Sequence, residues 1–139
     1  MLDCLILGDS IAKGVSDIRK ECVAYVKSGI NSKDYWNKNK AFLTKQDTLS
    51  VKTTIISLGS NDTDRIRTIE FANNIRERIK GRVYWILPSA EKKPVQHEVI
   101  KAVAKVWGDL TIQPDSGKLS PDKIHPTYAG YKDIAEHTK

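Results

Sequence analysis

Short apolar runs alternate along the chain with longer segments in which apolar residues recur every three or four positions. Runs of three to six residues, rich in β-branched and aromatic side chains and closed by glycine or proline signals, predict strands. Five segments have this character: Leu2–Leu7, Cys22–Val26, Thr53–Leu58, Arg82–Leu87 and Leu110–Ile112. The last is the shortest and the weakest of the five signals.

The segments between these runs have the period of amphipathic helices. One stripe consists of Ile66, Ile69, Ala72, Ile75 and Ile79, with Gly81 as a plausible terminator, and a second of Val95, Val99, Ala102, Val103 and Val106 after Pro94. Further helices are predicted over Asp34–Gln46 and from Thr127 to the last residue. Strands that alternate with helices and are apolar on both sides predict an α/β protein with a parallel sheet covered on both faces. The chain has 139 residues, a length typical of one domain, so a single domain over residues 1–139 is predicted.

The candidate catalytic residues of the chain follow the predicted strands. Ser10 follows the first strand, Gly29 the second and Asn61 the third, while Asp122 and His125 follow the fifth. In parallel sheets ligands bind at the carboxyl ends of the strands, so these side chains are expected to share one crevice.

This set of residue types suits acyl transfer. A serine hydroxyl is a weak nucleophile until a neighbouring base removes its proton, and histidine exchanges protons near neutral pH. Asp122, three residues before His125, can accept from the other ring nitrogen and fix its tautomer. The amides of Ser10 and Gly29 and the side chain of Asn61 could donate hydrogen bonds to an oxyanion.

Four blocks resemble the SGNH hydrolases, also called GDSL-like esterases and lipases. They are Gly-Asp-Ser at 8–10, Ser-Gly-Ile-Asn at 28–31, Gly-Ser-Asn-Asp at 59–62 and Asp-Lys-Ile-His-Pro-Thr-Tyr-Ala-Gly-Tyr at 122–131. The blocks occur in the family's order and span almost the whole chain, although each alone is weak. The resemblance implies a flavodoxin-like three-layer α/β/α sandwich with about five strands. It implies hydrolysis of carboxylic esters or thioesters, by Ser10, His125 and Asp122 with an oxyanion hole at Ser10, Gly29 and Asn61. Neither a metal nor an organic cofactor is expected.

Two residues depart from the family pattern. Ile11 stands where leucine usually follows the serine, and Lys123 stands where small residues are common. The chain is also short for the family, which predicts an open, shallow site and a small ester or acylated carbohydrate as substrate.

Composition narrows the possible partners. Lys and Arg exceed Asp and Glu by 23 to 17, a net charge of +6, but there is no long basic run, so nucleic acid is not expected. No segment reaches the roughly 18–20 apolar residues that span a bilayer, and the N-terminus lacks the features of a signal peptide. A cytoplasmic protein is the default expectation, although a removed leader would leave no trace. Cys4 and Cys22 lie in apolar runs and are expected to be buried free thiols; a disulfide would require neighbouring strands.

Two other functions stay open. An acyltransferase would use the same residues with an alcohol in place of water. A non-catalytic flavodoxin-like module would bind a phosphate at Gly8-Asp9-Ser10, but the chain lacks both GxGxxG and GxxxxGK[ST]. The absence of GxSxG around Ser10 argues against an α/β-hydrolase. Asp9 is expected to be structural, and His97 and His137 are expected to be exposed.

Overall fold

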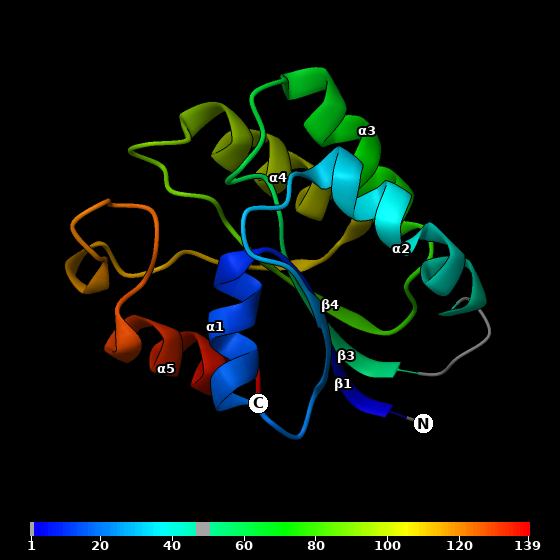
Figure 1. Cartoon of the computed structure of the whole chain (residues 1–139), viewed down its shortest axis with the longest axis horizontal. Coiled ribbons are helices and arrows are strands. Elements are labelled where there is room, and N and C mark those ends of the chain that lie inside the picture. Colours follow the sequence, from blue (N-terminus) through cyan, green and yellow to red (C-terminus); the bar gives the residue numbers. More distant parts are fainter. Residues whose placement is uncertain (1, 47–50) are drawn as a thin grey trace.

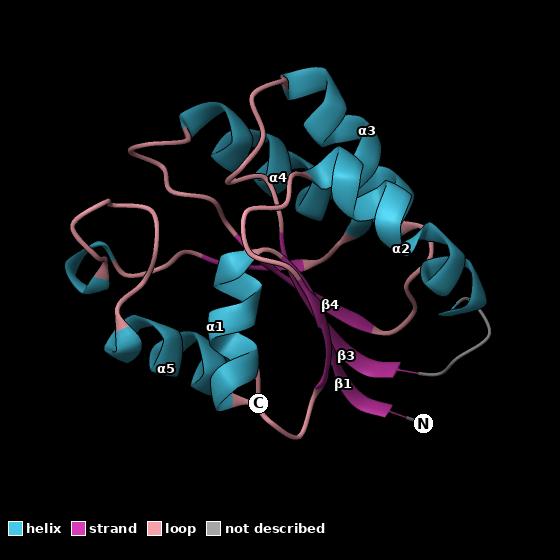
Figure 2. Cartoon of the chain, viewed as in Figure 1, coloured by secondary structure: helices cyan, strands magenta, loops and turns pink. Residues whose placement is uncertain are grey.

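A computed structural model, which describes residues 2–46 and 51–139, has a five-stranded parallel sheet at its centre (Figures 1 and 2). The strands are β1 (Leu2–Gly8), β2 (Val23–Val26), β3 (Val51–Ser57), β4 (Arg82–Ile86) and β5 (Leu110–Ile112). They pair in the order β2-β1-β3-β4-β5, and every pair is parallel. This is the flavodoxin-like order, so the predicted fold class is confirmed.

Helices cover both faces of the sheet (Figure 1). They are α1 (Ser10–Ile18), α2 (Ser32–Gln46), α3 (Arg65–Arg76), α4 (Pro94–Trp107) and α5 (Tyr128–His137), with a short 3₁₀ turn at Ser116–Lys118. Side chains of β1 point alternately to the two faces: Leu5 and Leu7 pack with α2, α3 and α4, whereas Cys4 and Ile6 pack with α1 and α5. The two buried clusters make the molecule a three-layer sandwich.

The sequence pattern did not predict α1. This helix has only nine residues, and Gly14 near its middle is a poor helix former. Packing explains the glycine, because a Cβ at position 14 would lie 2.3 Å from the ring of Tyr131 on α5. Within the described residues no helix is both long and apolar enough to cross a bilayer.

The prediction that His97 is exposed is wrong. Only 5% of this residue is accessible, and its Nδ1 lies 2.8 Å from the carbonyl oxygen of Pro88. His97 thereby holds the β4–α4 loop against the helix, a tertiary contact that helical periodicity cannot reveal. His137 is exposed as predicted.

The prediction of free thiols is also wrong, because Cys4 and Cys22 form a disulfide. The register between β1 and β2 pairs Leu5 with Val23, which places Cys22 directly beside Cys4. The bond closes a loop that contains α1 and lies at the amino end of β1, away from Ser10 at the carboxyl end.

Removal of this disulfide is expected to destabilise the fold without abolishing the chemistry. The cysteines are 18 residues apart, and a loop of that size is worth roughly 3 kcal/mol of unfolding free energy. Urea unfolding of the Cys4→Ala/Cys22→Ala protein should show a loss of about that size. Dithiothreitol should destabilise the wild type by a similar amount and leave the double variant unchanged. Equal stability of the wild type with and without reductant would contradict the prediction.

Candidate active site

The turn after β1 presents Ser10 at the start of α1. Gly8 has φ +135°, and a Cβ there would lie 1.9 Å from the carbonyl oxygen of Ser57 on β3, so the turn needs glycine. Asp9 is the N-cap: its Oδ1 accepts from the amides of Ile11 at 3.0 Å and Ala12 at 3.4 Å. The expectation that Asp9 is structural is consistent with this capping role.

Ser10, His125 and Asp122 form one chain of hydrogen bonds. Ser10 Oγ lies 2.7 Å from His125 Nε2, and His125 Nδ1 lies 2.6 Å from Asp122 Oδ2. Ser10 and His125 are 115 positions apart, so only the fold brings them together. About two fifths of the His125 side chain is exposed, which makes the arrangement accessible from solvent. A neutral imidazole in this position can accept the serine proton while Asp122 fixes its tautomer.

Asp122 also organises the loop that carries the histidine. Its Oδ1 accepts from the amides of Ile124 at 2.9 Å and His125 at 3.0 Å. These two backbone bonds and the bond from the His125 ring lower the pKa of Asp122 to about 2, so its carboxylate stays ionised at neutral pH. Lys123, which follows Asp122 in this loop, has φ +60°, a left-handed conformation that glycine, asparagine and aspartate adopt more readily than lysine.

The predicted oxyanion donors lie on the two neighbouring loops. Gly29 has φ +79°, and a Cβ at this position would meet nothing within 4 Å, so the space beside it is open. Asn61 Nδ2 donates to the carbonyl oxygen of Ile30 at 3.0 Å, which ties its loop to that of Gly29. An amide NH₂ has two hydrogens, so the second remains for a ligand.

Sequence reasoning gave no role to Asp62, which is buried and fixes the loop of Asn61 through hydrogen bonds. Its Oδ1 accepts from the amide of Ser32 at 2.8 Å, and its Oδ2 accepts from the hydroxyls of Ser32 and Thr68, both at 2.7 Å. Lys93 Nζ donates to its carbonyl oxygen at 2.6 Å. One carboxylate thus fixes the Asn61 loop to the starts of α2 and α3. The available signal was its place directly after Asn61 at a strand end.

Asp9 is fully buried beside Ser10, and the Ser57 side chain lies close to its carboxyl group. Burial raises the pKa of Asp9 from 3.8 to about 6. The folded state therefore holds this proton more tightly than the unfolded state. The contribution of Asp9 to stability is present at low pH and is lost as the pH rises from about 4 through 6.

Replacement of Asp9 by asparagine should remove this pH dependence. Asparagine can keep the Oδ1 cap without a buried charge, so the Asp9→Asn protein should gain stability relative to wild type as the pH rises. The relative gain between pH 4 and pH 7 should be about 2 kcal/mol, measured by urea unfolding. Asp17→Asn, at an exposed position of α1, is the control. A stability difference that does not change with pH would contradict the prediction.

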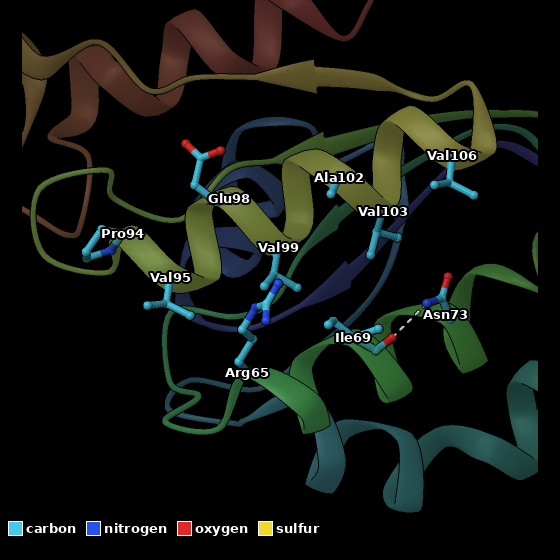
Figure 3. A pocket seen from close by; sticks show the side chains of 10 residues that line it. All are labelled: Arg65, Ile69, Asn73, Pro94, Val95, Glu98, Val99, Ala102, Val103 and Val106. Atoms are coloured by element: carbon cyan, nitrogen blue, oxygen red, sulfur yellow. Dashed lines mark hydrogen bonds between the residues drawn. The ribbon is translucent and has the colours of Figure 1, made fainter.

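A wide apolar groove of about 680 Å³ lies between α3 and α4, and it holds none of the predicted site residues (Figure 3). Ile69 and Val95 line it and are 37% and 47% exposed. The predicted stripes of these two helices therefore face partly into this groove and only partly into the core.

In the part of the chain that the structure describes, one group of three residues has possible metal-ligand atoms close together: Cys4, Glu21 and Cys22. The two sulfurs of this group are bonded to each other in the disulfide.

Comparison with known proteins gives structural neighbours only. No family model matches the chain, and no curated protein sequence matches it significantly. Among solved structures, a Bacteroides fragilis protein proposed to be an acylhydrolase superposes with a TM-score of 0.72 at 16% identity, over 97% of this chain and 83% of the other. A member of the lipolytic G-D-S-L family from Veillonella parvula gives a TM-score of 0.71 at 17% identity, over 98% and 95% of the two chains.

The catalytic domain of a Streptococcus pneumoniae peptidoglycan O-acetyltransferase, solved with a methylsulfonyl adduct, gives 0.67 at 12% identity, over 96% and 88%. These neighbours share the sandwich and nearly its full length, whereas their sequences are far apart. The chain therefore has the fold of the SGNH, or GDSL-like, hydrolases.

Proposed function

We propose that this protein is a serine esterase in which Ser10 is the nucleophile, His125 the general base and Asp122 the residue that orients the histidine. The observation that carries the proposal is the unbroken hydrogen-bond chain Ser10–His125–Asp122, with distances of 2.7 and 2.6 Å. The fold of hydrolases and acyltransferases that act on esters supports it.

The reaction would proceed through an acyl-enzyme. Ser10 Oγ attacks the ester carbonyl carbon as its proton passes to His125 Nε2, and the carbonyl oxygen becomes an oxyanion. The amides of Ser10 and Gly29 and the free N–H of Asn61 are the donors proposed to stabilise that charge. Collapse breaks the bond to the alcohol oxygen, which takes the proton from His125. Water then attacks the acyl carbon as His125 Nε2 takes one of its protons. Collapse breaks the bond to Ser10 Oγ, which regains that proton from His125, and the acid is released.

The exposure of His125 and Asp122 favours a small acyl group and a substrate that approaches from open solvent. Acetyl groups on carbohydrate are the substrates proposed first, since one structural neighbour is a peptidoglycan O-acetyltransferase. A thioester is the other candidate within the same chemistry.

Acyl transfer to an alcohol is a second proposal, favoured by the same neighbour. The two reactions differ only in what attacks the acyl-enzyme. Product analysis with an added sugar acceptor separates them: a hydrolase yields free acetate, whereas a transferase moves the acetyl group to the acceptor.

The phosphate-binding alternative fits the geometry less well. A phosphate at the start of α1 would need the amides of Ile11 and Ala12, but the Asp9 carboxylate already accepts from both.

The proposal is tested with purified protein, a short-chain nitrophenyl ester and a fluorophosphonate. Turnover of the ester and a single phosphonyl adduct located on Ser10 by peptide mass spectrometry are the expected results. Folded protein that neither turns over short esters nor forms an adduct would refute an activated serine.

A further inference from the structure

A small polar pocket adjoins Asn61 on the side of α2 and α3. It has a volume of about 80 Å³, and its lining includes Lys33 near the start of α2, Asn61 itself, and Asp64 and Arg67 at the start of α3. Asn61 therefore lines this pocket and is also the side chain proposed to bind the oxyanion. Asn61 is the residue that this lining shares with the proposed site, so a group in the pocket would contact a member of the proposed oxyanion hole.

The acidic side chains of this pocket are already engaged. The Asp62 carboxylate accepts from Ser32 and Thr68. Asp64 Oδ1 accepts from the amides of Ile66 at 2.8 Å and Arg67 at 3.2 Å. The first-turn amides that could hold an anion are thus taken by the protein's own carboxylates, and a ligand would have to be held by side chains.

The cationic side chains are not engaged in the same way. Across residues 2–46 and 51–139, neither the ammonium of Lys33 nor the guanidinium of Arg67 forms a hydrogen bond or an ion pair with another side chain. The lining holds two cations and two carboxylates, and the carboxylates accept hydrogen bonds from the protein, so an anion would be held by Lys33 and Arg67. A guanidinium donates two parallel N–H groups, the geometry that suits a carboxylate.

We propose that this pocket is a subsite for a carboxylate carried by the substrate, with Arg67 and Lys33 as specificity-determining residues. The inference rests on the proposed esterase function and narrows its substrate class to anionic esters. A hollow of about 80 Å³ has room for a carboxylate, since a cavity needs roughly 10–15 Å³ of this kind of volume for one water molecule. The carboxylate would be a substituent of the acyl group or of the alcohol.

The test compares matched esters that differ in one charge. 4-Nitrophenyl butyrate and 4-nitrophenyl hemisuccinate place the charge on the acyl side, and phenyl acetate and 3-carboxyphenyl acetate place it on the alcohol side. For each pair, kcat/KM is measured for wild type, for Lys33→Gln/Arg67→Gln and for Lys101→Gln/Lys132→Gln. The last variant loses the same charge at exposed positions of α4 and α5.

In one of the two pairs, the Lys33→Gln/Arg67→Gln protein should lose roughly 5–10-fold in kcat/KM for the charged ester and change little for the neutral one. The pair that responds identifies the side of the ester that carries the carboxylate. The Lys101→Gln/Lys132→Gln protein should keep the wild-type ratio of charged to neutral ester. An unchanged ratio in the Lys33→Gln/Arg67→Gln protein, or an equal fall in both double variants, would overturn the subsite.

A binding measurement separates this proposal from the esterase proposal. Isothermal titration calorimetry measures the binding of monoethyl succinate and of 3-methoxybenzoate to the Ser10→Ala protein, and it needs no turnover. If either probe binds to the Ser10→Ala protein but not to the Ser10→Ala/Lys33→Gln/Arg67→Gln protein, the subsite is supported even if no ester is cleaved. No binding of either probe, together with no charge preference in any ester that is cleaved, would overturn it.

Discussion

The Ser10→Ala protein is expected to lose ester hydrolysis by about 10⁴–10⁶-fold in kcat while keeping its fold. Among the described residues, the Ser10 hydroxyl has one hydrogen-bond partner, the Nε2 of His125 at 2.7 Å. Alanine removes the attacking oxygen and leaves the helix start intact, because Asp9 supplies the cap of α1. The residual rate of nitrophenyl ester hydrolysis measures the loss of activity. Circular dichroism and thermal unfolding of the same sample measure whether the fold is kept.

The matched variant is His125→Ala, which removes the base and leaves Ser10 in place. Because serine and histidine act as a unit, the two single variants and the double variant should show nearly the same residual rate. Ser16→Ala is the control and should keep full activity. Ser16 lies on α1, and its Oγ donates to the carbonyl oxygen of Lys13. Wild-type turnover in the Ser10→Ala protein would place the chemistry elsewhere.

Local pattern predicted the sheet well because its strands are apolar on both faces. The predicted fifth strand matches β5 at both ends. The first, second and fourth strands differ by one residue at one end, and the third starts two residues later and ends one residue later than β3. The site residues could be grouped without knowing any distance, since each follows a strand and all five strands are parallel. That rule places side chains at one edge, but the 2.7 Å contact between Ser10 and His125 depends on the packing of α1 and α5.

The errors arose where a contact across the fold decides the outcome. The disulfide depends on the register of β1 against β2, and the burial of His97 depends on the β4–α4 loop. Helix α1 is short and contains Gly14, a poor helix former whose role is visible only from its contact with Tyr131. Lys123 departs from the family pattern in residue type, and the structure adds a feature that the sequence did not reveal, a left-handed backbone with φ at +60°.

The Asn61→Ala protein is expected to lose about 10²–10³-fold in kcat, the usual cost of removing one oxyanion donor. The charge on the carbonyl oxygen exists only in the transition state and the tetrahedral intermediate, so KM should change little. Asn61 is exposed, and among the described residues its side chain makes one hydrogen bond, to the carbonyl oxygen of Ile30. The loss of this bond is a structural effect that must be separated from the loss of the donor.

Two readouts make that separation. A loop displaced by the loss of the Ile30 bond would raise KM and lower the melting temperature, whereas the loss of the oxyanion donor alone lowers kcat. Asn39→Ala is the matched control, because Asn39 Nδ2 also donates one bond of 3.0 Å to a backbone carbonyl, that of Tyr35, at a position outside the site. A fall in kcat confined to Asn61→Ala, with little change in KM, would identify its second N–H as an oxyanion donor. Full activity in that variant would leave the charge to the amides of Ser10 and Gly29 alone.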